Sequence, residues 1–114
     1  MEEAIENYVL AWNTGDGVSR KALLDKCFSV KGTYVDEHVP APVHDLNGML
    51  EVINTFRSRL PHKIVLKAAP QIHNHVFRLR WSLQIGDEKL SEGEFVGTVD
   101  ENVKISSVIG FLDR

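Results

Sequence analysis

The sequence lacks the features that mark disulfide-rich, membrane and secreted proteins. Its only cysteine, Cys27, cannot form an internal disulfide, and its place between Lys26 and Phe28 at an apolar helix end favours packing over a reactive thiol. No apolar run approaches the roughly 20 residues that span a membrane. Residues 1–3 (MEE) are acidic where a signal peptide begins with basic residues. We therefore expect a cytoplasmic protein that does not bind membranes.

An excess of positive charge is also missing. Lysine and arginine total 13 against 16 aspartate and glutamate residues, and the formal net charge is −3. This balance excludes the basic surface by which proteins bind nucleic acid. The sequence also has no glycine-rich phosphate loop, no nucleophile-elbow serine and no complete set of residues at metal-ligand spacing. We therefore expect no nucleic-acid partner and no nucleotide or metal cofactor.

The hydrophobic pattern predicts one domain that begins with three helices. With 114 residues, 43% of them hydrophobic, the chain is long enough for one core, and we expect residues 1–114 to form a single domain. Turn residues 13–17 end the first helix, and the second runs from a predicted N-cap at Ser19 to Phe28. The apolar stripe of the first helix is Ile5, Tyr8, Val9 and Trp12. The third helix, which ends before Pro61, carries Leu46, Met49, Leu50, Ile53, Phe56 and Leu60.

The rest of the chain has the period of β-strands. Residues 33–37 read as a short early strand, and residues 38–45, which contain two prolines, read as a loop. From residue 63 onward apolar and polar residues alternate, and turn residues separate the runs 63–68, 76–85, 90–99 and 103–112. This order predicts an α+β domain in which a curved antiparallel sheet wraps the helices.

Asp36 and Tyr8 are the candidates for catalysis. Asp36 lies at the end of the early strand, and Tyr8 lies on the stripe of the first helix. Such a pair suits proton transfer beside a carbonyl, because a carboxylate can take the proton and a phenol can hydrogen-bond the developing oxyanion. Each also has a structural interpretation, since Tyr8 can be a core residue and Asp36 can cap a turn of the loop. We predict that both side chains open into one cavity.

The histidines permit two further interpretations. His73 and His75 lie two residues apart at the start of an expected strand and would point to one face, but no third metal ligand accompanies them. A solvated role is therefore favoured over a zinc site. His38 and His44 lie in the proline-containing loop, where they could carry protons at the mouth of a pocket.

Arg78 and Arg80 share the strand face opposite Trp81. They face solvent or a dimer partner, or else one of them enters the fold and pairs with an acid such as Asp36 or Glu94. Alternation alone does not choose between these positions. An arginine beside Asp36 would lower the pKa of its carboxylate and make it a poorer base.

With this order of elements, the sequence resembles the NTF2-like superfamily, in its SnoaL-like and ketosteroid-isomerase-like branch. The likeness covers nearly the whole chain and rests on Phe28, Gly48 and the segments 8–16 (YVLAWNTGD), 32–36 (GTYVD), 77–81 (FRLRW) and 105–113 (ISSVIGFLD). It implies a cone of helices and curved sheet around an apolar pocket, often in a dimer joined through the outer sheet face. That superfamily includes isomerases, cyclases, dehydratases, hydrolases and non-catalytic binding domains, so no single activity is implied.

In the ketosteroid-isomerase pattern, two of the three catalytic positions match. The resemblance places Tyr8 where those enzymes carry an oxyanion-binding tyrosine and Asp36 where they carry the general base. The third position, an aspartic acid in the oxyanion site of those enzymes, is Phe95 here. One oxyanion donor is typically worth about 2.7–4 kcal/mol of transition-state stabilisation. The resemblance therefore implies weaker or different proton chemistry.

Two functions follow as hypotheses. The first is a cofactor-independent isomerase, cyclase or lyase that acts on an apolar carbonyl compound, with Asp36 as the base and Tyr8 steadying the enolate. The second is a non-catalytic ligand-binding or dimeric interaction domain. In both, we expect a small apolar ligand and a homodimer joined through the long strands. The residues expected to line the pocket are Trp12, Tyr34, Phe56, Trp81, Phe95 and Phe111.

Overall fold

The computed structural model describes residues 1–59 and 61–113, and in this part of the chain three helices and six strands form. Leu60, expected on the third helix, lies outside the described residues. The helices are α1 (Glu2–Asn13), α2 (Gly17–Cys27) and α3 (Leu46–Arg59). The strands are β1 (Phe28–Val35), β2 (Lys63–Leu66), β3 (Gln71–His73), β4 (Val76–Ile85), β5 (Glu88–Val99) and β6 (Ile105–Leu112).

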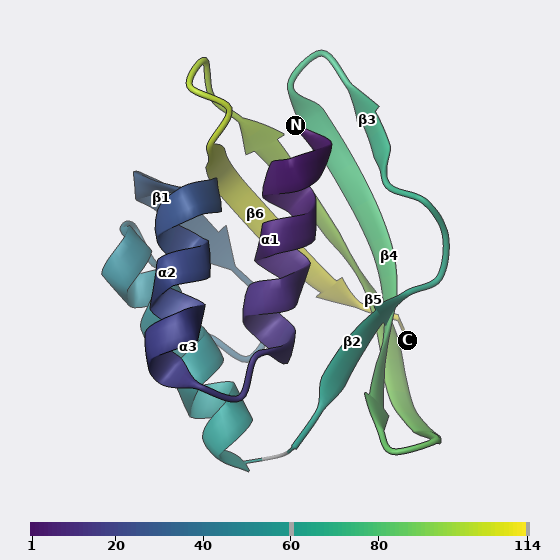
Figure 1. Cartoon of the computed structure of the whole chain (residues 1–114). Coiled ribbons are helices and arrows are strands. Elements are labelled where there is room, and N and C mark those ends of the chain that lie inside the picture. Colours follow the sequence, from purple (N-terminus) through teal and green to yellow (C-terminus); the bar gives the residue numbers. More distant parts are fainter. Residues whose placement is uncertain (60, 114) are drawn as a thin grey trace.

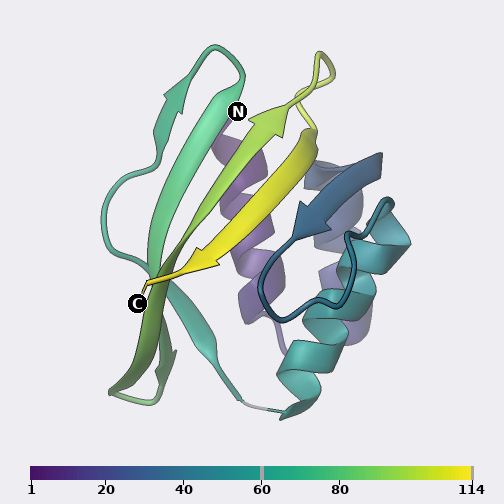
Figure 2. The same ribbon diagram turned by 180° about the vertical axis from the view of Figure 1, so that it is seen from behind.

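The strands form one curved sheet with the helices on one face (Figure 1). Its order is β1-β6-β5-β4-β2, and β3 pairs with β4. The long strands β4, β5 and β6 are antiparallel, as predicted, whereas β1 runs parallel to β6, with Tyr34 beside Val108. The sheet is therefore mixed. A parallel pair requires a long crossover connection, and the chain between β1 and β6 supplies it. Seen from behind, no helix of the described chain covers the opposite face (Figure 2).

The predicted starts of α2 and of the early strand were wrong. Helix α2 begins at Gly17, and its N-cap is Asp16, whose carboxylate accepts the backbone N–H groups of Val18 and Ser19 at 3.3 Å each. Strand β1 begins at Phe28 rather than Thr33, because α2 passes directly into extended backbone at that residue. Asp36 consequently follows the strand and starts the next loop.

The two histidines expected on one strand face do not lie on a common strand. Residues 71–73, between two of the predicted strands, form the short strand β3, which ends at His73. Asn74 and His75 make the turn into β4 with positive φ angles of 46° and 67°. In the described residues, no group of three or more histidine, cysteine, aspartate or glutamate side chains could hold a metal ion.

The core lies between the helices and the inner face of the sheet. Cys27 is fully buried there, and burial raises the pKa of its thiol to about 12, so it packs rather than reacts. The helices also bury large apolar side chains in this core, namely Ile5, Tyr8, Trp12, Leu24, Met49 and Ile53. Across from them, the sheet contributes Phe77, Leu79, Trp81, Phe95, Ile105 and Val108.

Side chains from other elements satisfy the carboxyl-terminal end of α1. That helix has no basic residue in its last turn, but Arg57 donates to the Trp12 carbonyl at 3.0 Å, and Arg20 donates to the Thr14 carbonyl at 2.6 Å. Carbonyl groups at a helix end otherwise lack partners and attract cations. The amide of Asn13 also exchanges two hydrogen bonds with the backbone of Ile64. These contacts hold α1, α2, α3 and β2 together at one end of the fold.

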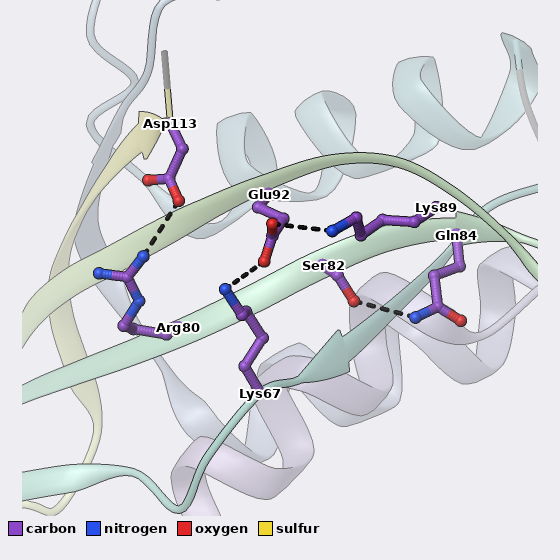
Figure 3. Close-up of polar contacts among 7 residues, drawn as sticks. All are labelled: Lys67, Arg80, Ser82, Gln84, Lys89, Glu92 and Asp113. Carbon is purple, nitrogen blue, oxygen red and sulfur yellow. Dashed lines mark hydrogen bonds and ion pairs between the residues drawn. The ribbon is translucent and has the colours of Figure 1, made fainter.

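Charged pairs occupy part of the outer face of the sheet. Arg78 pairs with Glu94 at 2.9 Å and Arg80 pairs with Asp113 at 3.0 Å, which places both arginines outside the cone. Figure 3 shows Arg80 with Asp113, and Glu92 between two lysines. The described residues contain no helix long and apolar enough to cross a membrane.

Candidate functional site

A cavity of about 440 Å³ opens between α3, the inner face of the sheet and the loop after β1. This volume lies within the range of about 300–1,000 Å³ that is usual for small-molecule sites. All six aromatic residues predicted for the pocket line it: Trp12, Tyr34, Phe56, Trp81, Phe95 and Phe111. The other apolar lining residues are Val39, Pro40, Val43, Val52, Ile64, Leu83 and Leu112.

Four rings form an aromatic wall of the cavity, with Phe95 at its centre and Trp12, Tyr34 and Trp81 around it. The ring of Trp12 stacks on it at 5.7 Å, that of Trp81 lies at 5.3 Å, and that of Tyr34 lies at 6.3 Å. Phe95 therefore fills its position by packing and offers no hydrogen bond. Phe111 lies only at the rim, because it stands opposite Glu94 on the outer sheet face and is 53% exposed.

The loop after β1 forms a wall of the cavity because it folds back along the strand. Tyr34 and Val43 exchange two backbone hydrogen bonds of 3.0 and 3.1 Å. Asp36 caps the first turn of this loop: its Oδ1 accepts the backbone N–H groups of His38 at 2.7 Å and of Val39 at 3.0 Å. Asp36 thus has the predicted structural role and also lines the cavity.

The second carboxylate oxygen of Asp36 pairs with Tyr34. The phenol of Tyr34 donates to Asp36 Oδ2 at 2.5 Å. A carboxylate has about four lone-pair sites, two on each oxygen. Two backbone donors occupy those of Oδ1, whereas Oδ2 has one donor, so a lone pair of Oδ2 has no donor among the contacts of this site.

Tyr34 is a neutral phenol in this setting. Burial raises the pKa of its hydroxyl well above the usual value, and the negative charge of Asp36 acts in the same direction. The hydroxyl therefore keeps its proton and can donate it in a hydrogen bond. Residues two apart on an extended segment point to the same side, so the spacing of Tyr34 and Asp36 in the sequence is the signal that predicts this pair.

The structure does not bring Tyr8 into the cavity with Asp36. Tyr8 is fully buried one layer deeper, edge-on to Phe95 at 5.7 Å, and is not part of the cavity lining. Its hydroxyl lies 4.0 Å from the sulfur of Met49, a weak acceptor. Burial raises the pKa of the Tyr8 hydroxyl above its ordinary range. The prediction of one cavity shared by Tyr8 and Asp36 was therefore wrong.

Gly110 is a residue of the candidate site that the sequence alone did not single out. It lines the cavity, and a Cβ at this residue would lie 3.1 Å from Asp36 Cβ and 3.3 Å from the hydroxyl oxygen of Tyr34. A glycine on β6 therefore lets the Tyr34–Asp36 pair lie close against the strand.

Charged residues lie around the mouth of the cavity. Glu37, Glu51 and Arg59 line it together with His38, as predicted for that histidine, whereas the exposed His44 is not among the lining residues. Glu37 Oε1 accepts the backbone N–H of Leu112 at 3.1 Å and so fixes the loop to the end of β6. The cavity thus combines an apolar interior with a polar rim.

Three solved structures illustrate what this fold is similar to. A candidate isomerase of the SnoaL-like family from Agrobacterium tumefaciens is 26% identical over 97% of this chain and 95% of that chain, with a TM-score of 0.89. An NTF2-like protein of unknown function from Exiguobacterium is 15% identical (96% and 98% covered, TM-score 0.74). A candidate ketosteroid isomerase from Kribbella flavida is 13% identical (97% and 76% covered, TM-score 0.76).

Comparison by sequence adds no family. No family profile matches the chain, and no curated protein matches it significantly. The likeness is therefore carried by structure, and it extends over nearly the whole chain in each case.

Proposed function

Since this chain has the NTF2-like fold and is similar to SnoaL-like and ketosteroid-isomerase-like proteins, we propose that it binds an apolar carbonyl compound and moves a proton next to the carbonyl. The single observation that carries this proposal is the position of Asp36, a carboxylate with one open lone pair at the wall of an apolar cavity. The reaction would be an isomerisation, cyclisation or elimination that needs no cofactor.

In this mechanism Asp36 Oδ2 is the base. The two backbone donors fix Oδ1 and orient the carboxylate, so that the open lone pair of Oδ2 is the position that takes the α-proton. The electron pair of the broken C–H bond then moves into the enolate, and its charge develops on the carbonyl oxygen. A protonated Asp36 returns the proton at another carbon, or loses it to solvent.

Tyr34 is the phenol that the geometry offers to the enolate. In the resting site its hydroxyl donates to Asp36 Oδ2. When Asp36 takes the proton, this oxygen loses its charge and the hydrogen bond to it weakens. The Tyr34 hydroxyl then turns to the enolate oxygen, which has gained charge, and stabilises it. This role replaces the one predicted for Tyr8.

A non-catalytic binding domain is the second candidate function, and Phe95 favours it. The resemblance to ketosteroid isomerases implies a second acid at this position, where this chain has a ring packed between Trp12 and Trp81. One donor is then missing from the oxyanion site. In this alternative the same cavity binds an apolar molecule and releases it unchanged.

Proton exchange separates the two candidates. Wild-type protein should accelerate deuterium incorporation beside the carbonyl of β-tetralone in D₂O, measured by NMR against the protein-free rate. Asp36→Asn should lower this acceleration by about 10²-fold or more, because the nearly isosteric amide cannot accept the proton. Asp87→Asn, in the exposed turn between β4 and β5, makes the same chemical change away from the cavity and should leave the rate unaltered. Equal rates in wild type and Asp36→Asn would remove Asp36 from the mechanism.

A further inference from the structure

A cationic cleft lies beside the cavity, at the end of the fold where α1 meets α2 and α3. Within the part of the chain that the structure describes, its lining contains three arginines and no aspartate or glutamate. The lining residues are Gly15, Gly17, Arg20, Asn54, Arg57, Ser58, Arg59 and Pro61. In a chain of net charge −3, this is a local concentration of positive charge.

Two of these arginines are fixed by the fold. Arg20 is only 4% exposed and donates to the Thr14 carbonyl and to Asn54. Its Nε is buried and has no hydrogen-bond partner among the described residues. Arg57 donates to the carbonyls of Trp12 and His62. Burial, and then the charge of Arg57, lower the pKa of Arg20. The two charges therefore repel each other, and their hydrogen bonds go to neutral acceptors. The carboxylate of Asp16 acts on the pKa of Arg20 in the opposite direction, but it is the last of the three causes.

Arg59 connects this cleft to the cavity, because it lines both. It is exposed in the last turn of α3, and within the described residues no carboxylate pairs with it. Its guanidinium can bind a carboxylate or phosphate through two parallel hydrogen bonds. Arg20 and Arg57 add positive potential behind it.

The rim of the cavity consequently has two ends of opposite charge. Glu51, Thr55 and Arg59 follow at four-residue spacing on α3, and all three line the cavity. Asp36 and Glu37 lie on the loop after β1, and this loop packs against the first turn of α3, where Val43 lies against Gly48, so they lie towards the Glu51 end of the helix. Glu51 and Arg59 are about 12 Å apart along the helix axis, at 1.5 Å per residue. A ligand with an anion at one end would be attracted at Arg59 and repelled at the acidic end.

We propose that the ligand carries an anionic group, a carboxylate or a phosphate, which binds Arg59 and the cationic cleft while the apolar body occupies the cavity. This inference rests on the proposed function, since it takes the cavity as the ligand site. It orients the ligand, with the reacting carbonyl at Asp36 and the anion at the other end. The substrate class is then an elongated apolar carbonyl compound with one anionic terminus.

Two fluorescent probes with the same aromatic skeleton test the charge directly. Anilinonaphthalenesulfonate carries a sulfonate, and N-phenylnaphthylamine is its neutral counterpart. The anionic probe should bind at least about fivefold more tightly at low salt, and Arg59→Gln should remove most of that difference while leaving the neutral probe unaffected. Arg78→Gln removes an arginine from the outer sheet face and should change neither affinity. Equal affinity of both probes, or no effect of Arg59→Gln, would overturn the inference.

The same titrations distinguish this inference from the proposed function. If neither probe binds, the apolar cavity is not a ligand site and the proposed function fails with it. If the neutral probe binds and the anionic probe binds no more tightly, the cavity is a ligand site and only the proposed anionic group of the ligand is wrong. If the anionic probe binds more tightly, displacement of the neutral probe by naphthoate, naphthyl phosphate and naphthol identifies the anion. Naphthoate or naphthyl phosphate should bind more tightly than naphthol, and this difference in affinity should disappear in Arg59→Gln. If naphthol bound as tightly as naphthoate and naphthyl phosphate, the inference would be contradicted.

Discussion

At the scale of single residues, the site depends on which phenol reaches the carboxylate. Tyr34 and Asp36 lie two apart on an extended segment and meet at 2.5 Å, whereas Tyr8 packs behind Phe95. A helical stripe shows that a residue faces the core but not how deep it lies in it. For this reason the sequence was sufficient to select Asp36 as a candidate and to place Tyr34 at the pocket, but not to pair them.

The two tyrosines should differ in their effect on the proton-exchange rate. Tyr34→Phe removes the hydroxyl that hydrogen-bonds Asp36 and is available to the enolate, so exchange beside the carbonyl of β-tetralone should fall by about 10²-fold. Tyr8→Phe, the matched change, removes a hydroxyl that does not line the cavity and should alter the rate by about threefold or less. The measurement is NMR-detected exchange with both variants folded. A larger loss in Tyr8→Phe than in Tyr34→Phe would reverse the assignment.

At the scale of elements, the β4–β5 hairpin is stabilised on its outer face by charge. Glu92 on β5 pairs with Lys67 and with Lys89, the latter at 2.9 Å (Figure 3). Hydrogen bonds from Lys67 and then Lys89 lower the pKa of Glu92 from 4.5 to about 2. Lys67 follows β2, so this cluster also connects β2 to the hairpin.

The lowered pKa of Glu92 predicts a pH dependence of stability. The folded state holds the proton of Glu92 less tightly than the unfolded state, so this group stabilises the fold above about pH 4.5, and the contribution is lost as pH falls towards about 2. Wild type should therefore melt at a higher temperature than Glu92→Gln at pH 7, and the two should converge in acid. Glu101→Gln, an exposed turn residue, is the matched control. A difference in melting temperature that did not change with pH would contradict this account.

The sequence predicts secondary structure well where a hydrophobic pattern extends over many residues. It predicts less where the pairing between strands determines the structure. The alternation of β4 and β5 and the stripes of α1 and α3 were predicted, because each exposes one face and buries the other. The parallel pairing of β1 with β6 was not, since strand direction depends on contacts between distant segments. The cap at Asp16 was also missed, because Ser19 three residues later is an equally good capping residue.

At the scale of the whole molecule, the two faces of the sheet differ in what covers them. The inner face holds the cavity, and the predicted NTF2-like cone of helices and curved sheet is confirmed. The outer face has an apolar patch where β1, β6 and β5 meet, formed by Val35, Val96, Ile109 and Phe111. No helix of the described chain covers it (Figure 2). We propose that a second copy of the chain does.

A charge in the centre of this patch should break the dimer. Ile109 is 43% exposed and lies between Val35 and Val96, so Ile109→Lys would place a charge inside the proposed interface. Light scattering should give twice the chain mass of 12.9 kDa for wild type and the single mass for this variant. Val18→Lys, on the exposed side of α2, should remain a dimer. Wild type at 12.9 kDa at micromolar concentration would refute the proposal.

The central claim is that an apolar carbonyl compound binds inside the cone against the aromatic wall, beside Asp36. Intermolecular nuclear Overhauser effects between β-tetralone and the protein test it most directly, because they report which side chains the ligand touches. The account predicts effects from the aromatic protons of the ligand to the rings of Trp81 and Phe56, and it predicts them in Asp36→Asn as well, since that change removes the base and leaves the cavity. Effects confined to the outer face around Ile109, or none at saturating ligand, would contradict it.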